Sequence, residues 1–167
     1  MIRAPGGRKR SGSDAAARLG VGARRRAREL AFRVAYQSDL TRDGYAATWA
    51  AMREEERLSE DQRVLVEDVV GLLEARAAEV DAALAGACAH WPLERLAATD
   101  RSVLRAAVAE LMARPGTPAP VVLDEAIEIA RRYGSEESGA FVNGVLDAIA
   151  RGVPGKELPA VPSGEEE

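Results

Sequence analysis

The residues of this chain that are best suited to chemistry are arginines concentrated at one end. Ten of the 23 basic residues lie in the first 33 positions, where only Asp14 and Glu29 oppose them, so this segment carries a net charge of +8. The remaining residues carry a net charge of −12. A guanidinium group presents a planar set of donors that matches phosphate oxygens, and it also stacks on exposed bases. The segregation therefore predicts a polyanion-binding site confined to one end of the protein.

An aromatic residue accompanies these arginines. At 100° per residue, Arg25, Arg28 and Tyr36 lie along one edge of a predicted helix. Single-stranded RNA is recognised by cations that bind its phosphate backbone and by aromatic rings that stack on its bases, so this combination suits it. The alternative, a basic helix start that only aids solubility, stays open. Arginines at a helix N-terminus oppose the helix dipole, so stabilising the helix does not explain them.

The sequence contains no recognisable catalytic or metal-binding constellation. Cys88 and His90 are the only cysteine and histidine, too few for a zinc site or a histidine-based triad. Four carboxylates on two predicted helices lack a partner base and are interpreted as surface and capping charges: Glu110, Asp124, Glu125 and Glu128. We therefore expect a non-enzymatic protein without a metal or a cofactor. A lone cysteine favours a cytoplasmic location, and no apolar stretch reaches the about 20 residues of a membrane-spanning helix.

Composition and periodicity predict an all-α fold. Hydrophobic residues make up 47% of the chain but aromatic residues only 4%, and alanine, the best helix former, dominates the apolar set. Apolar periodicity predicts about seven helices, at residues 24–40, 44–56, 59–84, 92–96, 99–111, 121–133 and 135–149. These positions divide the chain into a disordered basic arm (1–23), a helical domain (24–151) and a disordered acidic tail (152–167).

Several residues are predicted to begin or end these helices. Ser59 and Gln62 have the spacing of a capping box, in which each side chain bonds the backbone N–H of the other residue. Thr99 and Ser135 are predicted N-caps of the two helices that follow them. Gly134 is predicted to end a helix in the left-handed conformation.

Four stretches resemble the NusB family of bacterial transcription antitermination proteins. They are RRRARELAFRVAYQ at 24–37, WPLERLAATDRSVLRAAVAEL at 91–111, PVVLDEAIEIARRYGSEESGAFVNGVLDAI at 120–149 and, more weakly, residues 59–71. The resemblance implies two packed three-helix groups and no enzymatic activity. It also implies binding of the boxA element of nascent ribosomal RNA as a heterodimer with NusE, a small-subunit ribosomal protein, within an antitermination complex on RNA polymerase.

The resemblance also implies which residues bind. The family's RNA-contacting positions fall on Arg24, Arg25, Arg26, Arg28, Tyr36, Arg105, Glu137 and Phe141, and its partner-contacting positions on Glu94 and Asp100. Three positions depart from the family pattern: Asp124 stands for an asparagine, Ala109 for a tyrosine, and Ala140 for a basic residue near the RNA path. These departures leave the fold prediction unchanged but weaken the prediction of RNA affinity.

Other classes of protein stay open at this point. The chain resembles the RNA-targeting domain of some rRNA methyltransferases, although it has no glycine-rich motif for a methyl donor. A helical scaffold for protein interaction is another reading, and a helix-turn-helix DNA binder would need polar base-reading residues on a recognition helix. An apolar surface meant for the partner could also pair with a second copy, so a homodimer of the free chain is left open.

Overall fold

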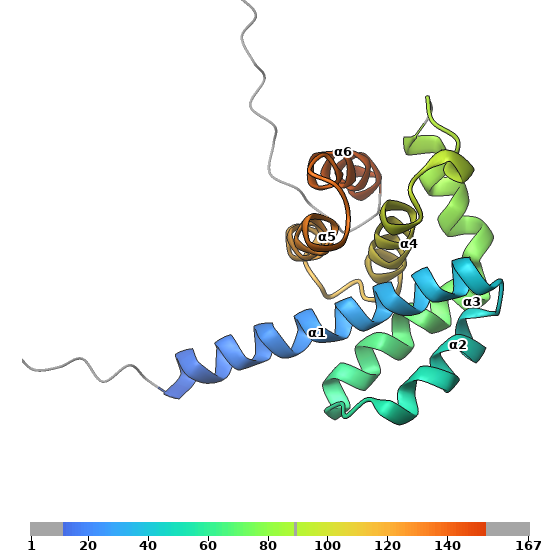
Figure 1. The fold of residues 1–167 in the computed structure, drawn as a ribbon. Coiled ribbons are helices and arrows are strands. Elements are labelled where there is room, and N and C mark those ends of the chain that lie inside the picture. The colour runs from blue at the N-terminus through green and yellow to red at the C-terminus, as the bar shows by residue number, and fades with distance from the viewer. Residues whose placement is uncertain (1–11, 89, 153–167) are drawn as a thin grey trace, which may run out of the picture.

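The computed structural model describes residues 12–88 and 90–152, and every regular element in them is a helix (Figure 1). The α-helices are α1 (Gly12–Thr41), α2 (Tyr45–Met52), α3 (Glu60–Ala87), α4 (Ala98–Ala113), α5 (Ala119–Tyr133) and α6 (Ser138–Arg151). Two 3-10 helices, η1 (Arg53–Glu55) and η2 (Leu93–Arg95), lie in the connections on either side of α3. The all-α prediction is confirmed, with six α-helices where about seven helices were expected.

The helices form two groups of three that pack on each other. Helices α1, α2 and α3 contact one another, α5 and α6 pack together on α4, and α4 contacts α1 and α3 of the first group. Fully buried leucines such as Leu65, Leu104 and Leu146 fill the core. Small residues allow α1 to approach its neighbours closely, since Ala27, Ala31 and Ala35, one turn apart, are all buried. The predicted pair of three-helix groups is therefore confirmed.

Helix α1 is longer than predicted. It begins at Gly12 rather than at Arg24, and its first turns extend beyond the other helices (Figure 1). Once a helix is nucleated by packing, each further residue adds one backbone hydrogen bond, and the alanines at 15–17 favour that extension. The rest of the predicted arm (1–11) and all but the first residue of the predicted tail (153–167) lie outside the described residues, so disorder there stays a prediction.

The predicted capping box is confirmed, but two other N-caps were wrong. Gln62 N donates to Ser59 Oγ at 3.2 Å, and Ser59 N donates to Gln62 Oε1 at 2.9 Å. Helix α4 begins at Ala98, before Thr99, and its N-cap residue makes no side-chain hydrogen bond. Helix α6 begins at Ser138 rather than after Ser135, because Ser138 Oγ accepts a hydrogen bond from Ser135 N at 2.9 Å and closes a turn there.

Gly134 ends α5 for a reason other than the predicted one. Its backbone is extended (φ −100°, ψ −157°), so the predicted left-handed cap was wrong. A β-carbon at this position would lie 2.8 Å from the carbonyl oxygen of Ala130 and would also meet the Ser138 side chain. Glycine therefore lets the start of α6 pack closely against the end of α5.

The capping box of α3 generates a stability prediction. Replacing Ser59 by Ala leaves the Gln62 N–H without its side-chain acceptor and should lower the free energy of unfolding by about 1 kcal/mol. Urea denaturation followed by circular dichroism measures this difference. Ser59→Asp keeps a cap acceptor and should stay close to the wild type. Equal stability of the wild type and the alanine variant would contradict the prediction.

Candidate nucleic-acid interface

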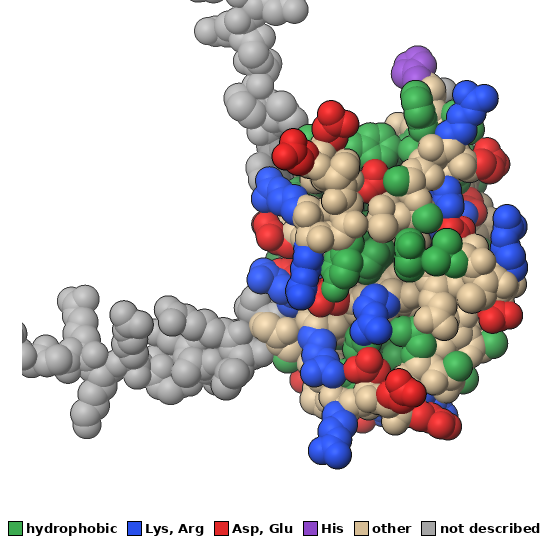
Figure 2. Space-filling model, viewed as in Figure 1, with side chains coloured by type: hydrophobic (Ala, Val, Ile, Leu, Met, Phe, Trp, Pro, Cys, Tyr) green, Lys and Arg blue, Asp and Glu red, His purple; other side chains and the backbone are tan. Residues whose placement is uncertain are grey.

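An open groove runs between α1 and the end of α5, and we call it the α1 groove. Its lining combines aromatic rings with arginines and comprises Arg26, Glu29, Leu30, Phe32, Arg33, Tyr36, Glu56, Thr99 and Tyr133. On the face that α1 crosses, basic and hydrophobic side chains alternate, with acidic side chains beside them (Figure 2). The surface thus offers rings and cations together rather than a uniformly basic patch.

Three aromatic rings form a row along the α1 groove. The ring centroids of Tyr36 and Phe32 lie 6.0 Å apart, and those of Phe32 and Tyr133 lie 5.1 Å apart. Phe32 is buried, whereas Tyr36 is half-buried and Tyr133 is exposed. The Arg132 guanidinium carbon lies 5.5 Å from the Tyr133 ring centroid, within the range of a cation–π interaction. The two tyrosines are therefore the rings available to stack on a base.

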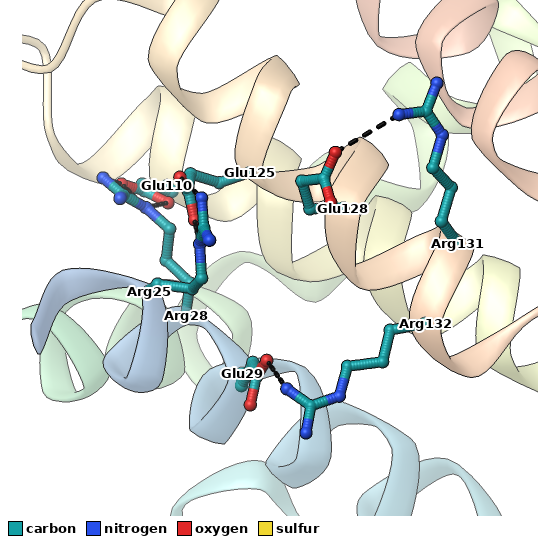
Figure 3. Close-up of polar contacts among 8 residues, drawn as sticks. All are labelled: Arg25, Arg28, Glu29, Glu110, Glu125, Glu128, Arg131 and Arg132. Atoms are coloured by element: carbon teal, nitrogen blue, oxygen red, sulfur yellow. Dashed lines mark hydrogen bonds and ion pairs between the residues drawn. The ribbon is translucent and has the colours of Figure 1, made fainter. Parts of the chain in front are cut away.

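The arginines on the groove rim are held by carboxylates that lie deeper. Arg26 Nη2 donates to Glu56 Oε2 at 2.9 Å, and Arg33 Nη1 lies 3.8 Å from Glu56 Oε1. Arg132 Nη1 donates to Glu29 Oε1 at 2.7 Å (Figure 3). The three arginine side chains are 52–66% exposed, and the two glutamates are 17–20% exposed. Each guanidinium group therefore faces solvent while its carboxylate partner lies beneath it.

Two of the predicted RNA-binding arginines contact internal carboxylates instead. Arg28 is only 8% exposed, and its Nε and Nη2 donate three hydrogen bonds of 2.8–3.0 Å to Glu110, which is 3% exposed (Figure 3). Arg25, on the same edge of α1, donates through Nε and Nη2 to Glu125 at 3.0 and 3.1 Å. Arg25 remains 48% exposed, and its hydrogen bonds with Glu125 raise its pKa.

These pairs change the roles that the sequence predicted. Because Arg28 is almost fully buried and bonded to Glu110, we assign it a role in joining α1 to α4. The interpretation of Glu110 and Glu125 as surface charges was wrong, because both are buried. Charged residues are rarely buried unless paired, and one sequence does not reveal which carboxylate a buried arginine will meet.

The remaining predicted cations lie in different places. Arg24 is exposed and lines a separate depression with Pro118 and Val121. Arg105 is mostly buried and donates to Asp81 and Asp39, with its Nη1 at 3.0 Å from Asp39 Oδ1. Asp39 lies 14 residues after Arg25 on α1, which is about 21 Å along the helix. The structure therefore does not bring Arg105 together with the N-terminal arginines.

Asp39 is the centre of an ion-pair cluster at the end of α1. Arg101 Nη2 donates to Asp39 Oδ2 at 2.6 Å, and Arg105 donates to its other oxygen. Burial alone would raise the pKa of Asp39, but the hydrogen bonds and charges of both arginines outweigh it, and the pKa is lowered. Arg101 Nη1 also donates to the carbonyl oxygens of Leu93 and Leu96. The cluster thereby fastens the η2 segment to α1 and α4.

A second groove, which we call the η2 groove, brings together predicted residues from distant parts of the chain. It is lined by Asp100, Glu137 and Phe141, and by Trp91, whose side chain is 54% exposed. Glu94 is exposed on the adjoining η2 helix but does not line the groove. Of the predicted residues, the structure therefore brings Arg26 and Tyr36 together in the α1 groove and Asp100, Glu137 and Phe141 together in the η2 groove, and it places the others elsewhere.

Sequence reasoning missed several residues of the α1 groove. Arg33 lies seven positions after Arg26, so helical periodicity already placed both on one face of α1. Tyr133 and Glu56 belong to other elements, and only the tertiary fold brings them to the groove, with Arg132 beside it through its pair with Glu29. Within the part of the chain that the structure describes, no group of metal-ligating side chains occurs and no helix could cross a membrane.

The fold and its two grooves define a small all-helical binding protein, and comparison with known proteins identifies its family. A model of the NusB family matches residues 25–151. Transcription antitermination protein NusB of Koribacter versatilis is 44% identical over 134 residues, which cover 78% of this chain and 90% of that protein. The NusB of Geobacter sulfurreducens is 43% identical over 143 residues, 81% of this chain and 99% of that protein. This chain belongs to the NusB family of transcription antitermination proteins.

Solved structures agree with this assignment. A structure of T. maritima NusB superposes with a TM-score of 0.71 at 34% identity, covering 77% of this chain and 90% of that chain. A crystal structure of antitermination factors NusB and NusE in complex with double-stranded RNA superposes with a TM-score of 0.71 at 27% identity, covering 78% and 98%. The two packed three-helix groups of this chain are therefore the architecture of the family.

The buried Arg28–Glu110 pair generates a second stability prediction. Glu110→Ala leaves a buried guanidinium without a partner and should cost about 3–5 kcal/mol of unfolding free energy. Replacing both residues, Arg28→Met with Glu110→Leu, should recover most of that loss, because two apolar side chains leave no buried charge. Glu128→Ala, which removes an exposed pair, serves as the control and should cost less than about 1 kcal/mol. Equal losses of unfolding free energy in Glu110→Ala and Glu128→Ala would refute the structural role of the Arg28–Glu110 pair.

The lowered pKa of Asp39 predicts a pH dependence. Because the pKa is lower in the folded state, ionised Asp39 stabilises the fold above its unfolded-state pKa of about 3.9, and this contribution disappears as pH falls through the folded-state pKa. The stability difference between the wild type and Asp39→Asn should be largest near neutral pH and should narrow below about pH 4. Urea denaturation across a pH series tests this, with exposed Asp43→Asn as the control. A difference that does not vary with pH would contradict it.

Proposed function

We propose that this protein is an antitermination factor that binds boxA-type single-stranded RNA of nascent rRNA transcripts jointly with ribosomal protein NusE. The observation that carries the proposal is the α1 groove, where Tyr36 and Tyr133 are accessible beside the rim arginines. Rings that stack on splayed bases, next to guanidinium groups that hold phosphates, are the elements of single-strand recognition. The protein would act in the cytoplasm, without enzymatic activity, within a complex on RNA polymerase.

The charge of the α1 groove explains why a partner is needed. Arg26 and Arg33 of the lining are balanced by Glu29 and Glu56, and Arg132 beside the groove brings the net charge to only +1. Such a weakly basic surface binds a polyanion weakly, so a second protein that adds cations and contacts should raise the affinity. The related structure of NusB and NusE in complex with double-stranded RNA supports RNA and NusE as the partners.

The η2 groove is the surface that we assign to the NusE side of the complex. Its exposed Trp91 supplies an apolar anchor of the kind that dominates protein interfaces. Asp100 and the neighbouring Glu94 are the acidic residues predicted to meet the partner, and Glu137 and Phe141, which are predicted to contact RNA, line the same groove. RNA and partner would therefore approach from adjacent surfaces.

The predicted RNA contacts on α1 are accordingly revised in our proposal. Arg24, Arg26 and Tyr36 keep a direct role because their side chains reach solvent. Arg25 keeps a partial role, since its Nε and Nη2 already donate to Glu125. Arg28 supports the fold rather than the RNA because it is bonded to buried Glu110, and Arg105 of α4 does so because its own side chain is mostly buried and bonded to Asp39 and Asp81.

Binding of single-stranded boxA-like RNA, measured by fluorescence anisotropy with and without NusE across a salt series, tests the proposal. Tyr36→Ala and Tyr133→Ala should each weaken binding by about 1–3 kcal/mol, the value of one base–ring stack. Trp91→Ala, an exposed aromatic residue outside the α1 groove, should leave binding unchanged when NusE is absent and should weaken it when NusE is present. Competing duplex RNA and duplex DNA should displace the probe poorly. Preference for a duplex, or unchanged affinity in both tyrosine variants, would overturn the proposal.

A further inference from the structure

Two arginines on the rim of the α1 groove converge on a single carboxylate. Arg26 and Arg33 are seven residues apart on α1, which separates their α-carbons by about 10.5 Å along the helix. Their guanidinium groups nevertheless reach the two oxygens of Glu56, at 2.9 Å for Arg26 and 3.8 Å for Arg33. The two side chains therefore form a fork around one anionic group, and we call this pair the arginine fork.

The fork is bound to Glu56 but retains unused donors. Arg26 donates to Glu56 through Nη2 alone, and Arg33 is at ion-pair distance without a hydrogen bond. A guanidinium group has five N–H donors, so most of them remain free on the solvent side. Both arginine side chains are more than half exposed, whereas the Glu56 side chain is 17% exposed. An incoming phosphate group can therefore meet these exposed donors first and then compete with Glu56 for the two guanidinium groups.

Glu56 lies on a part of the backbone that allows its side chain to leave the fork. It follows η1, with an extended backbone (φ −104°, ψ 127°), and belongs to the connection that precedes Ser59. Its backbone N–H donates to Arg53 O at 3.1 Å, a bond within the η1 turn that does not involve the side chain. Rotation of the Glu56 side chain thus requires no change in any α-helix.

We propose that the arginine fork is a phosphate-binding site and that Glu56 occupies it as an internal anion until an RNA phosphate displaces it. This inference rests on the proposed RNA binding in the α1 groove and adds a residue that opposes binding. RNA that binds only through its charge must break the ion pairs of Glu56 and gains no other contact. RNA whose bases also stack on Tyr36 and Tyr133 offsets the loss of those ion pairs. Glu56 therefore reduces the affinity for unspecific RNA more than the affinity for RNA that fits the groove.

The Glu29–Arg132 pair does not share this arrangement. It joins one carboxylate to one guanidinium group, at 2.7 Å, across α1 and α5. Displacing Glu29 would therefore free one cation only, whereas displacing Glu56 would free two that converge on one point.

Glu56→Gln tests the proposal because glutamine keeps an acceptor for Arg26 but removes the charge that competes with phosphate. We expect oligoadenylate to bind the full-length variant roughly three- to tenfold more tightly at low salt, with a smaller increase in affinity for boxA-like RNA. The plot of log K against log salt should become steeper by about 0.7 for each additional phosphate that the arginine fork neutralises. Glu55→Gln, an exposed neighbour with the same change in charge, is the matched control and should leave the salt slope unchanged.

The outcomes separate this inference from the proposed function. Weaker or unchanged RNA binding by Glu56→Gln would mean that Glu56 only positions the arginines, and it would overturn the inference. An equal increase in affinity in Glu55→Gln would reduce the effect to overall charge and would also overturn it. Arg33→Ala should cost more affinity in the Glu56→Gln background than in the wild type. If Arg26→Ala and Arg33→Ala both bind RNA as tightly as the wild type, RNA does not bind in the α1 groove. That result would overturn the proposed RNA site whatever Glu56→Gln shows.

Discussion

The buried ion pair between Arg28 and Glu110 is the constraint on which the arrangement of the binding surface depends. It joins α1 of the first helix group to α4 of the second, and both side chains are almost fully buried. Arg25, one turn away, makes a matching pair with Glu125 of α5. A buried ion pair tolerates little change in geometry, since an unpaired buried charge is costly. The two pairs therefore fix the rotation of α1 about its own axis.

The rotation of α1 decides which of its arginines can meet a ligand. Successive residues differ by 100° around a helix, so Arg25 and Arg26 point in different directions although they are adjacent. The edge with Arg25 and Arg28 turns toward α4 and α5, whereas Arg26 and Arg33 turn toward the groove and Glu56. One cluster of arginines therefore serves two purposes, holding the helix groups together and presenting cations to solvent.

Local rules predicted most of the fold, and contacts between distant residues account for most of what they missed. The apolar period and the Ser59 capping box depend on residues a few positions apart, so the sequence was sufficient for them. Glu110 was interpreted as a surface charge because its partner Arg28 lies 82 positions away. Gly134 was missed for a different reason: its need for a small residue comes from the nearby Ala130 carbonyl oxygen and Ser138 side chain and not from a left-handed backbone. In the α1 groove, the sequence predicted only residues that lie on α1 and none that other elements contribute.

Ion pairs between the α1 arginines and carboxylates of other elements reduce the attraction of a polyanion to the basic N-terminal segment. Of the α1 arginines from Arg24 onward, Arg25, Arg26, Arg28 and Arg33 all face carboxylates from other elements. Charge counted along the sequence therefore overstates the field that a polyanion meets on the described surface. Specific recognition then depends more on the accessible tyrosine rings and on a partner than on attraction alone, because stacking is insensitive to neighbouring carboxylates whereas phosphate binding is not. A groove built in this way favours a strand with splayed bases over one that offers only charge.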